Sequence, residues 1–137
     1  MSKPSKFKNQ SVTIDGRKFA STLEAARYLE LRDMEKKGLI LDLECQVRFE
    51  LVAKTKTMAA ASYVADFQYK RSAVGITTTI VEDAKGMRTA LFNLKNKILA
   101  EKGIVLTLIK KEDLTPGYYD LAKGIRDLGL DYSTGIK

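Results

Sequence analysis

Two neighbouring runs of this 137-residue chain restrict its fold most, because each combines β-forming residues with one aspartate. Residues 62–70 read S-Y-V-A-D-F-Q-Y-K, and residues 76–85 read I-T-T-T-I-V-E-D-A-K. Valine, isoleucine, threonine and aromatic residues favour strands, whereas aspartate is depleted there. Side chains alternate along a strand, so Asp83 and Lys85 share one face. With Asp66 on the preceding strand, the pattern is suited to holding a hard divalent cation beside a cationic group.

The scarcity of cysteine and histidine limits the chemistry that the chain can perform. It has one cysteine, Cys45, and no histidine. A zinc site needs nitrogen or sulfur ligands and is excluded, as are histidine general bases and Ser-His triads. The single cysteine also excludes an internal disulfide and fits a reducing cytoplasm. Any catalysis therefore depends on carboxylates, lysine, tyrosine or a metal with oxygen ligands.

Positive charge is the strongest feature of the composition. Lys and Arg number 24 against 17 Asp and Glu, which gives a net charge of +7. Such an excess indicates a polyanionic partner, most often nucleic acid, although a basic soluble protein without such a partner is the plain alternative. No apolar run has the length of a membrane span, and the start, M-S-K-P-S-K-F-K, lacks the apolar core of a signal peptide. We therefore expect a cytoplasmic protein without a membrane partner.

Apolar periodicity and turn residues predict the elements of the first half. A hairpin at 12–19, with Asp15-Gly16 as its turn, precedes a helix at 21–37 that Gly38 is expected to end. Ser21 is a good cap for this helix, and Glu24 follows it at the spacing of a capping box. The next run, 39–52, alternates well and is predicted to be one long strand, or two with a kink. Its predicted buried face comprises Leu41, Leu43, Cys45, Val47, Phe49 and Leu51.

The second half is predicted to complete the sheet. Strand 39–52 and the two aspartate-bearing runs are joined by short connections, which favours an antiparallel meander. A helix at 90–101 follows, with Thr89 as its cap. A strand at 104–109 would then lie parallel to a neighbour through a right-handed crossover. The predicted apolar face of the helix comprises Leu91, Leu94 and Ile98.

The two ends of the chain are predicted to flank one domain of residues 1–137. Residues 1–10 carry three lysines and are expected to form a flexible basic arm. Residues 112–137 are expected to form a C-terminal extension with a weak helix at 118–128. No internal repeat and no second domain is indicated.

The order helix, three-stranded meander, helix and strand, with D…D-x-K on the second and third strands, resembles the PD-(D/E)XK nuclease superfamily. The motif here is Asp66, sixteen intervening residues, and then Asp83-Ala84-Lys85. More specifically, the chain resembles a family of small phage proteins described as Holliday-junction-resolvase-like. The proline that precedes the first aspartate in the superfamily is replaced by Ala65. The matching stretches span roughly residues 11–110 and include S-T-L-E-A-A-R-Y-L-E-L, L-I-L-D-L-E-C-Q-V-R-F-E-L, Y-V-A-D-F-Q-Y and V-E-D-A-K-G-M-R-T.

This resemblance implies a fold and a metal site. The fold would be α/β (α+β), with a restriction-endonuclease-like core of three meander strands and a parallel fourth strand flanked by helices. Mg²⁺, which Mn²⁺ can replace, would be held by Asp66, Asp83 and the backbone carbonyl of Ala84. Lys85 would be the catalytic lysine. Glu24 matches an extra acid that many members use, although the capping box explains it equally well.

Further polar residues lie near these positions in the predicted fold. The candidates for binding a nucleic acid are Arg88 and Thr89, at the start of the second helix, and Lys95 within that helix. Thr89 is also the cap of the helix, and Lys95 is also explained as a solvated flank. Gln46, on the polar face of its strand, either reaches the site or is simply exposed. Glu82 faces away from the second aspartate in a regular strand, so we interpret it as structural.

These features together predict a Mg²⁺-dependent endonuclease that hydrolyses phosphodiester bonds in DNA. Branched or junction DNA in phage recombination or replication is the expected substrate. A resolvase cuts two strands symmetrically, so a homodimer is expected. The rival hypothesis is a non-catalytic DNA-binding accessory protein with a nuclease-like fold, and a further rival is a basic structural protein with a chance motif.

Overall fold

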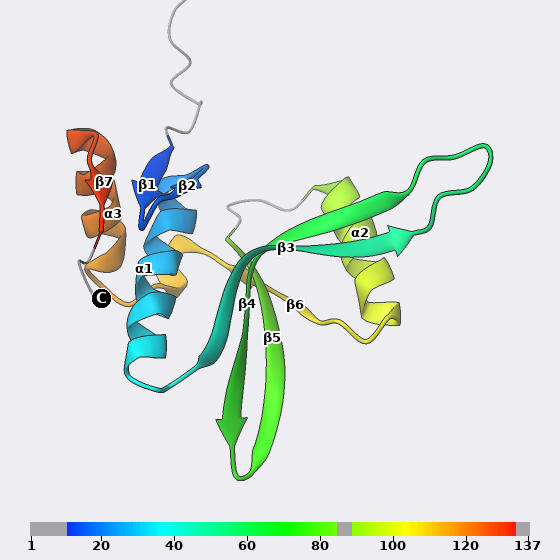
Figure 1. Cartoon of the computed structure of the whole chain (residues 1–137), viewed down its shortest axis with the longest axis horizontal. Coiled ribbons are helices and arrows are strands. Elements are labelled where there is room, and N and C mark those ends of the chain that lie inside the picture. Colours follow the sequence, from blue (N-terminus) through cyan, green and yellow to red (C-terminus); the bar gives the residue numbers. More distant parts are fainter. Residues whose placement is uncertain (1–10, 85–88, 134–137) are drawn as a thin grey trace, which may run out of the picture. The chain divides into compact units, whose positions relative to one another are not determined.

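The computed structural model describes residues 11–84 and 89–133, which form a mixed α and β structure with three α-helices and two sheets (Figure 1). The chain divides into two compact units, a terminal unit (residues 1–30 and 111–137) and a central unit (residues 31–110). None of the helices in the described ranges is long and apolar enough to cross a membrane. The elements, in chain order, are β1 (Val12–Ile14), β2 (Arg17–Phe19), α1 (Thr22–Lys36), β3 (Leu41–Val52), β4 (Ala61–Ala73), β5 (Ile76–Ala84), α2 (Ala90–Glu101), β6 (Leu106–Ile109), the 3₁₀ helix η1 (Lys111–Asp113), α3 (Tyr118–Leu128) and β7 (Asp131–Tyr132).

In the terminal unit, three short strands form one sheet in the order β2-β1-β7. β1 pairs antiparallel with β2 through the predicted Asp15-Gly16 turn, and it pairs parallel with β7, a strand that was not predicted in the C-terminal extension. The backbone N–H of Asp15 donates to the Tyr132 carbonyl at 2.7 Å, and Tyr28 Oη donates to Asp15 Oδ2 at 2.7 Å. The buried apolar side chains of this unit include Val12, Ile14, Phe19, Leu29, Ala122 and Ile125.

Local sequence signals set the ends of the first helix. Ser21 Oγ accepts a hydrogen bond from the Glu24 backbone N–H at 3.1 Å, which confirms the predicted cap. At the other end, Gly38 has a φ of 78°, and the Leu39 N–H donates to the Met34 carbonyl. A residue in the left-handed conformation followed by such a bond is the Schellman pattern of helix termination.

In the central unit, four strands form one sheet in the order β3-β4-β5-β6. β3, β4 and β5 pair antiparallel, and β6 returns parallel to β5 after α2, so the predicted meander and parallel fourth strand are confirmed. A buried apolar cluster joins the sheet to α2. It comprises Leu51, Tyr63, Ala65, Val81, Phe92, Leu99 and Leu106.

Two predicted apolar faces of this unit are wrong in detail. On β3 the predicted alternation is present, but the apolar face is mostly half-buried: only Leu51 is buried, and Leu41 is 49% exposed. β3 is an edge strand, and its register with β4 is irregular near its start. On α2, Leu91 and Leu94 are exposed, and Phe92 and Leu99 are the buried pair instead. The sequence of α2 carries apolar residues on two sides, and periodicity alone does not show which side meets the sheet.

Candidate functional site

Asp66 on β4 and Asp83 on β5 lie side by side in the central unit. The Asp66 backbone N–H donates to Asp83 Oδ1 at 2.8 Å, and the Ala84 backbone N–H donates to Asp66 Oδ2 at 2.9 Å. Each carboxylate therefore accepts a hydrogen bond from the backbone of the opposite strand. Asp83 is only 2% exposed, whereas Asp66 is partly exposed. These reciprocal bonds orient both side chains and hold two acidic groups together.

The pair lies where β4 and β5 part. Their ladder runs from Ala73 and Ile76 at the turn to Phe67 and Glu82. One step further, Asp66 and Asp83 face each other, and their carboxylate-to-backbone bonds take the place of ladder bonds. β4 continues with β3 toward Ala61, and Figure 1 shows the two hairpins that share β4 running in different directions. The two carboxylates thus mark a fork in the sheet.

Glu82 has a different environment from its neighbour Asp83. It pairs with Phe67 across the ladder and accepts a hydrogen bond from the hydroxyl of Tyr69. Both Glu82 and Tyr69 are buried, at 2% and 3% exposure. A buried carboxylate with a phenol donor satisfies the interior of the sheet. The Tyr69 bond is consistent with the structural role predicted for Glu82.

Gln46 is the residue that sequence reasoning left open. In the register of β3 and β4, Cys45 lies opposite Phe67 and Val47 opposite Ala65, so Gln46 lies opposite Asp66. Its φ is 56°, in the left-handed region that a strand does not normally use. Its side chain is exposed. The fork thus has a strained residue beside it on β3. Backbone strain of this kind is not revealed by the alternation of apolar and polar residues.

The other predicted site residues are distributed as follows. Ala84 ends β5 and holds Asp66 through its N–H. Lys85 and Arg88 lie outside the described residues. Glu24 belongs to the terminal unit, where it lies in the first turn of α1 and is buried. Its role as an extra acid stays a prediction.

Two predicted residues lie at the start of α2 and along it. Thr89 Oγ1 accepts a hydrogen bond from the Phe92 backbone N–H at 3.0 Å, which confirms its capping role. Lys95 Nζ donates to the Ser62 carbonyl on β4 at 3.4 Å. Lys95 is therefore tied to the same strand as Asp66, four residues along. The ammonium group of this α2 residue therefore contacts the strand that carries the first carboxylate.

The donor set of the fork fits a hard divalent cation. Among the described residues, no group of three or more His, Cys, Asp or Glu is placed to hold a metal ion. Mg²⁺, however, usually takes one or two carboxylates from a protein and keeps several waters. A carboxylate offers roughly four lone-pair sites, so a backbone hydrogen bond and a metal ion can share one carboxylate. Two aligned carboxylates are therefore a sufficient protein contribution for Mg²⁺ or Mn²⁺.

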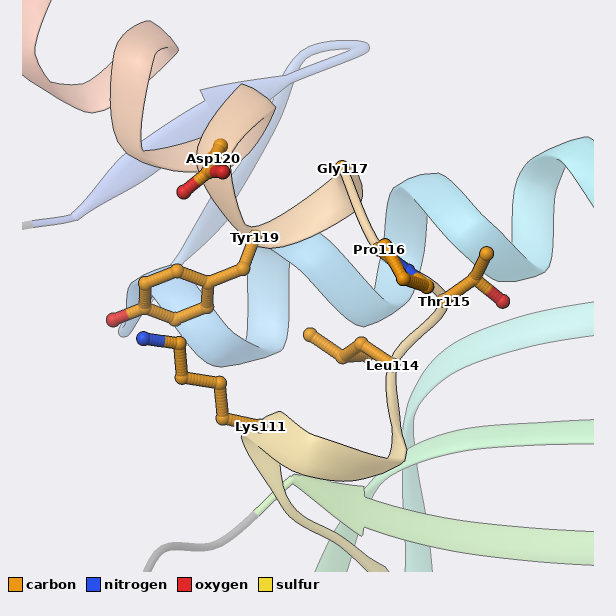
Figure 2. Close-up of a pocket in the computed structure, with 7 residues that line it drawn as sticks. All are labelled: Lys111, Leu114, Thr115, Pro116, Gly117, Tyr119 and Asp120. Carbon is orange, nitrogen blue, oxygen red and sulfur yellow. The ribbon is translucent and has the colours of Figure 1, made fainter.

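A cavity of about 300 Å³ lies in the terminal unit, near the start of α3 (Figure 2). Lys111 Nζ lies 4.3 Å from the centroid of the Tyr119 ring, a cation–π contact. The lining carries one cation and one carboxylate and includes none of the residues predicted for the site. The lining residues are Lys111, Leu114, Thr115, Pro116, Gly117, Tyr119 and Asp120.

Comparison with curated proteins and with solved structures found no match. A family model described as "Protein of unknown function (DUF1064)" matches residues 4–123. The match spans most of the chain and includes both aspartates of the fork together with every predicted site residue. The chain therefore belongs to the DUF1064 family.

Proposed function

We propose that the chain is a metal-dependent endonuclease that hydrolyses phosphodiester bonds in DNA. The observation that carries the proposal is the reciprocal pair of Asp66 and Asp83 at the fork between β4 and β5. Aspartate is disfavoured in strands, and burying one costs free energy unless it is hydrogen-bonded or paired. A hydrogen-bonded pair of carboxylates at this place in the sheet, in a chain of net charge +7, is suited to a cation and a polyanion.

The proposal gives each residue of the fork a separate task. Asp66 and Asp83 would hold Mg²⁺ or Mn²⁺ together with the Ala84 carbonyl, in the positions that the superfamily resemblance implies. When bound, such an ion supplies an activated water and polarises the phosphoryl oxygen. The backbone N–H groups of Asp66 and Ala84 keep the carboxylates in place before the ion arrives. Lys85 takes the part of the catalytic lysine.

Other residues of the chain would bind the substrate. Lys95 and Arg88 offer cations for phosphates, and Thr89 opens a helix whose first N–H groups favour anions. Gln46, opposite Asp66, offers a side-chain amide at the third strand of the fork. Branched or junction DNA is the proposed substrate, and a homodimer that cuts two strands is the proposed assembly. The restriction-endonuclease-like core belongs to the same proposal and is supported by the meander and parallel fourth strand.

Cleavage of a four-way DNA junction tests the proposal. The full chain should cut the junction with Mg²⁺ and not with EDTA. Asp83→Asn keeps an oxygen that accepts the Asp66 N–H but removes the charge, so it should stay folded and lose at least about 10²-fold in cleavage rate. Asp42→Asn is the matched control, because Asp42 is an exposed carboxylate on β3 of the same sheet. It should cut normally.

Binding measurements complete the test. Calorimetric titration with Mn²⁺ alone should show a binding site in the wild-type chain and in Asp42→Asn. The same titration of Asp83→Asn should show no such site. DNA affinity of Asp83→Asn should be unchanged or higher, because a carboxylate that repels phosphates has gone. Binding of the junction without cleavage, in each of Mg²⁺, Mn²⁺ and Co²⁺, would remove the nuclease proposal.

That outcome would favour the second candidate, a non-catalytic DNA-binding accessory protein. It is supported by one observation, which is that no group of three or more potential ligands occurs in the described part of the chain. In this case Asp83→Asn and the wild-type chain would bind the junction alike, with and without divalent cations. The reciprocal bonds of the two aspartates would then serve only to end the ladder of β4 and β5.

A further inference from the structure

The far end of the β4–β5 hairpin is a two-stranded ribbon, residues 70–79, in which every residue is exposed. Its ladder is regular, with Lys70 opposite Thr79 and Ala73 opposite Ile76. The pairing of β3 with β4 ends at Lys70, and that of β6 with β5 begins at Val81, so no other strand within residues 11–84 and 89–133 pairs with the rest of the ribbon. Figure 1 shows this hairpin projecting from the sheet of the central unit. A lone two-stranded ribbon is at best marginally stable in water, so the ribbon adds little to the core.

The turn of the ribbon contains a residue that the turn itself disfavours. Val74 has a φ of 53° and Gly75 a φ of 76°, which is the backbone of a type I′ turn. The other tight hairpin, at Asp15-Gly16, has φ values of 55° and 76° and carries the expected aspartate. A β-branched residue at positive φ is strained. Val74 is also 98% exposed, so packing within the chain does not offset the strain.

The side chains of the ribbon match a nucleic-acid surface. Residues 70–79 carry two cations, four hydroxyls and no carboxylate. Lysine, arginine, serine and threonine are the residues that contact DNA phosphates, and a two-stranded ribbon fits the major groove. Lys70 Nζ also lies 3.5 Å from Asp42 Oδ2, with both side chains exposed. Apart from Val74, the exposed large apolar side chain of the ribbon is Ile76, at 67%, which is too little apolar surface for a stable protein interface.

We infer that the ribbon is a DNA-binding arm that lies in a groove of the duplex beside the cleaved bond, with Val74 at its tip against the bases. The inference rests on the proposed function. Apolar tips that press between base steps are a known means of unstacking DNA, at a cost that added contacts offset. Val74 directly follows β4 and lies eight residues after Asp66, which is roughly 26 Å at about 3.3 Å per residue. The tip should therefore contact DNA roughly eight base pairs from the cut, at about 3.4 Å per base pair.

Val74→Asn separates the roles of the tip in folding and in binding. Asparagine is favoured at this turn position, so the melting temperature should be equal or higher. The affinity for a four-way junction should fall about tenfold, as expected for one lost apolar contact of about 1.4 kcal/mol. Fluorescence anisotropy with Mg²⁺ measures this affinity, and both chains carry Asp83→Asn so that the junction is not cut. Val105→Asn is the matched control, because Val105 is another valine of the central unit and is 76% exposed. It should bind like the parent.

Two further measurements address the arm itself. Arg71→Ala should reduce the slope of log affinity against log salt by about one, whereas Lys37→Ala, an exposed cation outside the ribbon, should not. A junction with 2-aminopurine placed roughly eight base pairs from the cut should gain fluorescence on binding of the Asp83→Asn chain. Val74→Asn in the same background should abolish that gain.

The outcomes distinguish the arm from the nuclease proposal. If the wild-type chain cuts the junction and Val74→Asn binds it with unchanged affinity, the inference is overturned and the proposed function stands. Equal binding by Arg71→Ala and Lys37→Ala at every salt concentration would likewise remove the arm. If the wild-type chain cuts no DNA while Val74→Asn weakens binding as expected, the arm stands and the second candidate function replaces the first.

Discussion

At the scale of single residues, the left-handed positions of β3 are the least expected feature of the fork. Asp42 and Gln46 have φ values of 57° and 56° within one strand. Non-glycine residues at such angles cost roughly 1–2 kcal/mol. Asp42 lies where the register with β4 shifts, so an irregular ladder accounts for it. Gln46 lies in an unshifted register opposite Asp66, where its side-chain amide would serve the substrate under the proposed function.

Gln46→Gly should separate the side chain from the backbone strain. Glycine adopts positive φ freely, so the variant should be as stable as the wild type or more so, by up to about 1 kcal/mol. If the amide serves the substrate, cleavage of the junction should nevertheless fall by about tenfold. Thermal melting and single-turnover cleavage measure the two effects. Asp42→Gly is the matched control, and an equal loss of cleavage in both variants would contradict a role for the Gln46 amide.

At the scale of elements, buried hydrogen bonds hold the segments of the terminal unit together. Glu30 near the middle of α1 is 7% exposed and accepts bonds from Thr115 N at 3.1 Å and from Thr115 Oγ1 at 2.5 Å. Arg27 Nη1 donates to the other carboxylate oxygen at 2.8 Å. Thr22 Oγ1 accepts from Arg126 Nη1 on α3 at 2.9 Å. Helix α1 is thus joined by side chains to two segments that lie 85 and 104 residues further along the chain.

Glu30→Ala should weaken this unit strongly. The substitution leaves the Thr115 donors and the Arg27 guanidinium without their carboxylate, and losses of this kind cost about 2–4 kcal/mol. Urea denaturation followed by circular dichroism should show a lower midpoint. Glu112→Ala, in an exposed position of the same unit, should change the free energy of unfolding by less than about 0.5 kcal/mol. A loss for Glu30→Ala as small as that of the control would show that solvent replaces these bonds.

At the scale of the whole molecule, the positive charge is uneven along the chain. Residues 31–110 carry fourteen Lys and Arg against nine Asp and Glu, a net +5 of the total +7. This is the segment that forms the fork and the ribbon. Two carboxylates of the central unit, Glu82 and Asp83, are buried and therefore add little negative charge to its surface. Its outer surface is therefore more cationic than the composition states.

Salt should weaken DNA binding steeply for this reason. If four phosphates are neutralised, raising the salt from about 50 to about 200 mM should lower the affinity roughly 10²-fold. Anisotropy titrations of a DNA junction at several salt concentrations, with the Asp83→Asn chain, measure the slope. A chloride-to-glutamate exchange at constant ionic strength controls for specific anion effects. An affinity that does not change over this range would count against nucleic acid as the partner.

Local signals in the sequence were enough for most elements. The Ser21 cap, the Gly38 stop, the Asp15-Gly16 turn and the Thr89 cap each act over a few residues, and the structure contains all of them. The helix predicted at 118–128 has the same bounds as α3. The sequence also placed Asp66 and Asp83 on neighbouring antiparallel strands, and the register that brings them opposite each other comes from the tight turn between β4 and β5.

What the sequence could not decide depends on contacts between distant segments. The pairing of β1 with β7 joins residues more than a hundred positions apart, and the buried side of α2 is chosen by the sheet it meets. The left-handed Gln46, the strained Val74 and the reciprocal bonds of the aspartates are backbone geometries that no residue pattern encodes. The sequence by itself determined the residue types of the fork and their strands. Only the tertiary structure decided how those strands part, because parting depends on the pairing of β4 with two different neighbours.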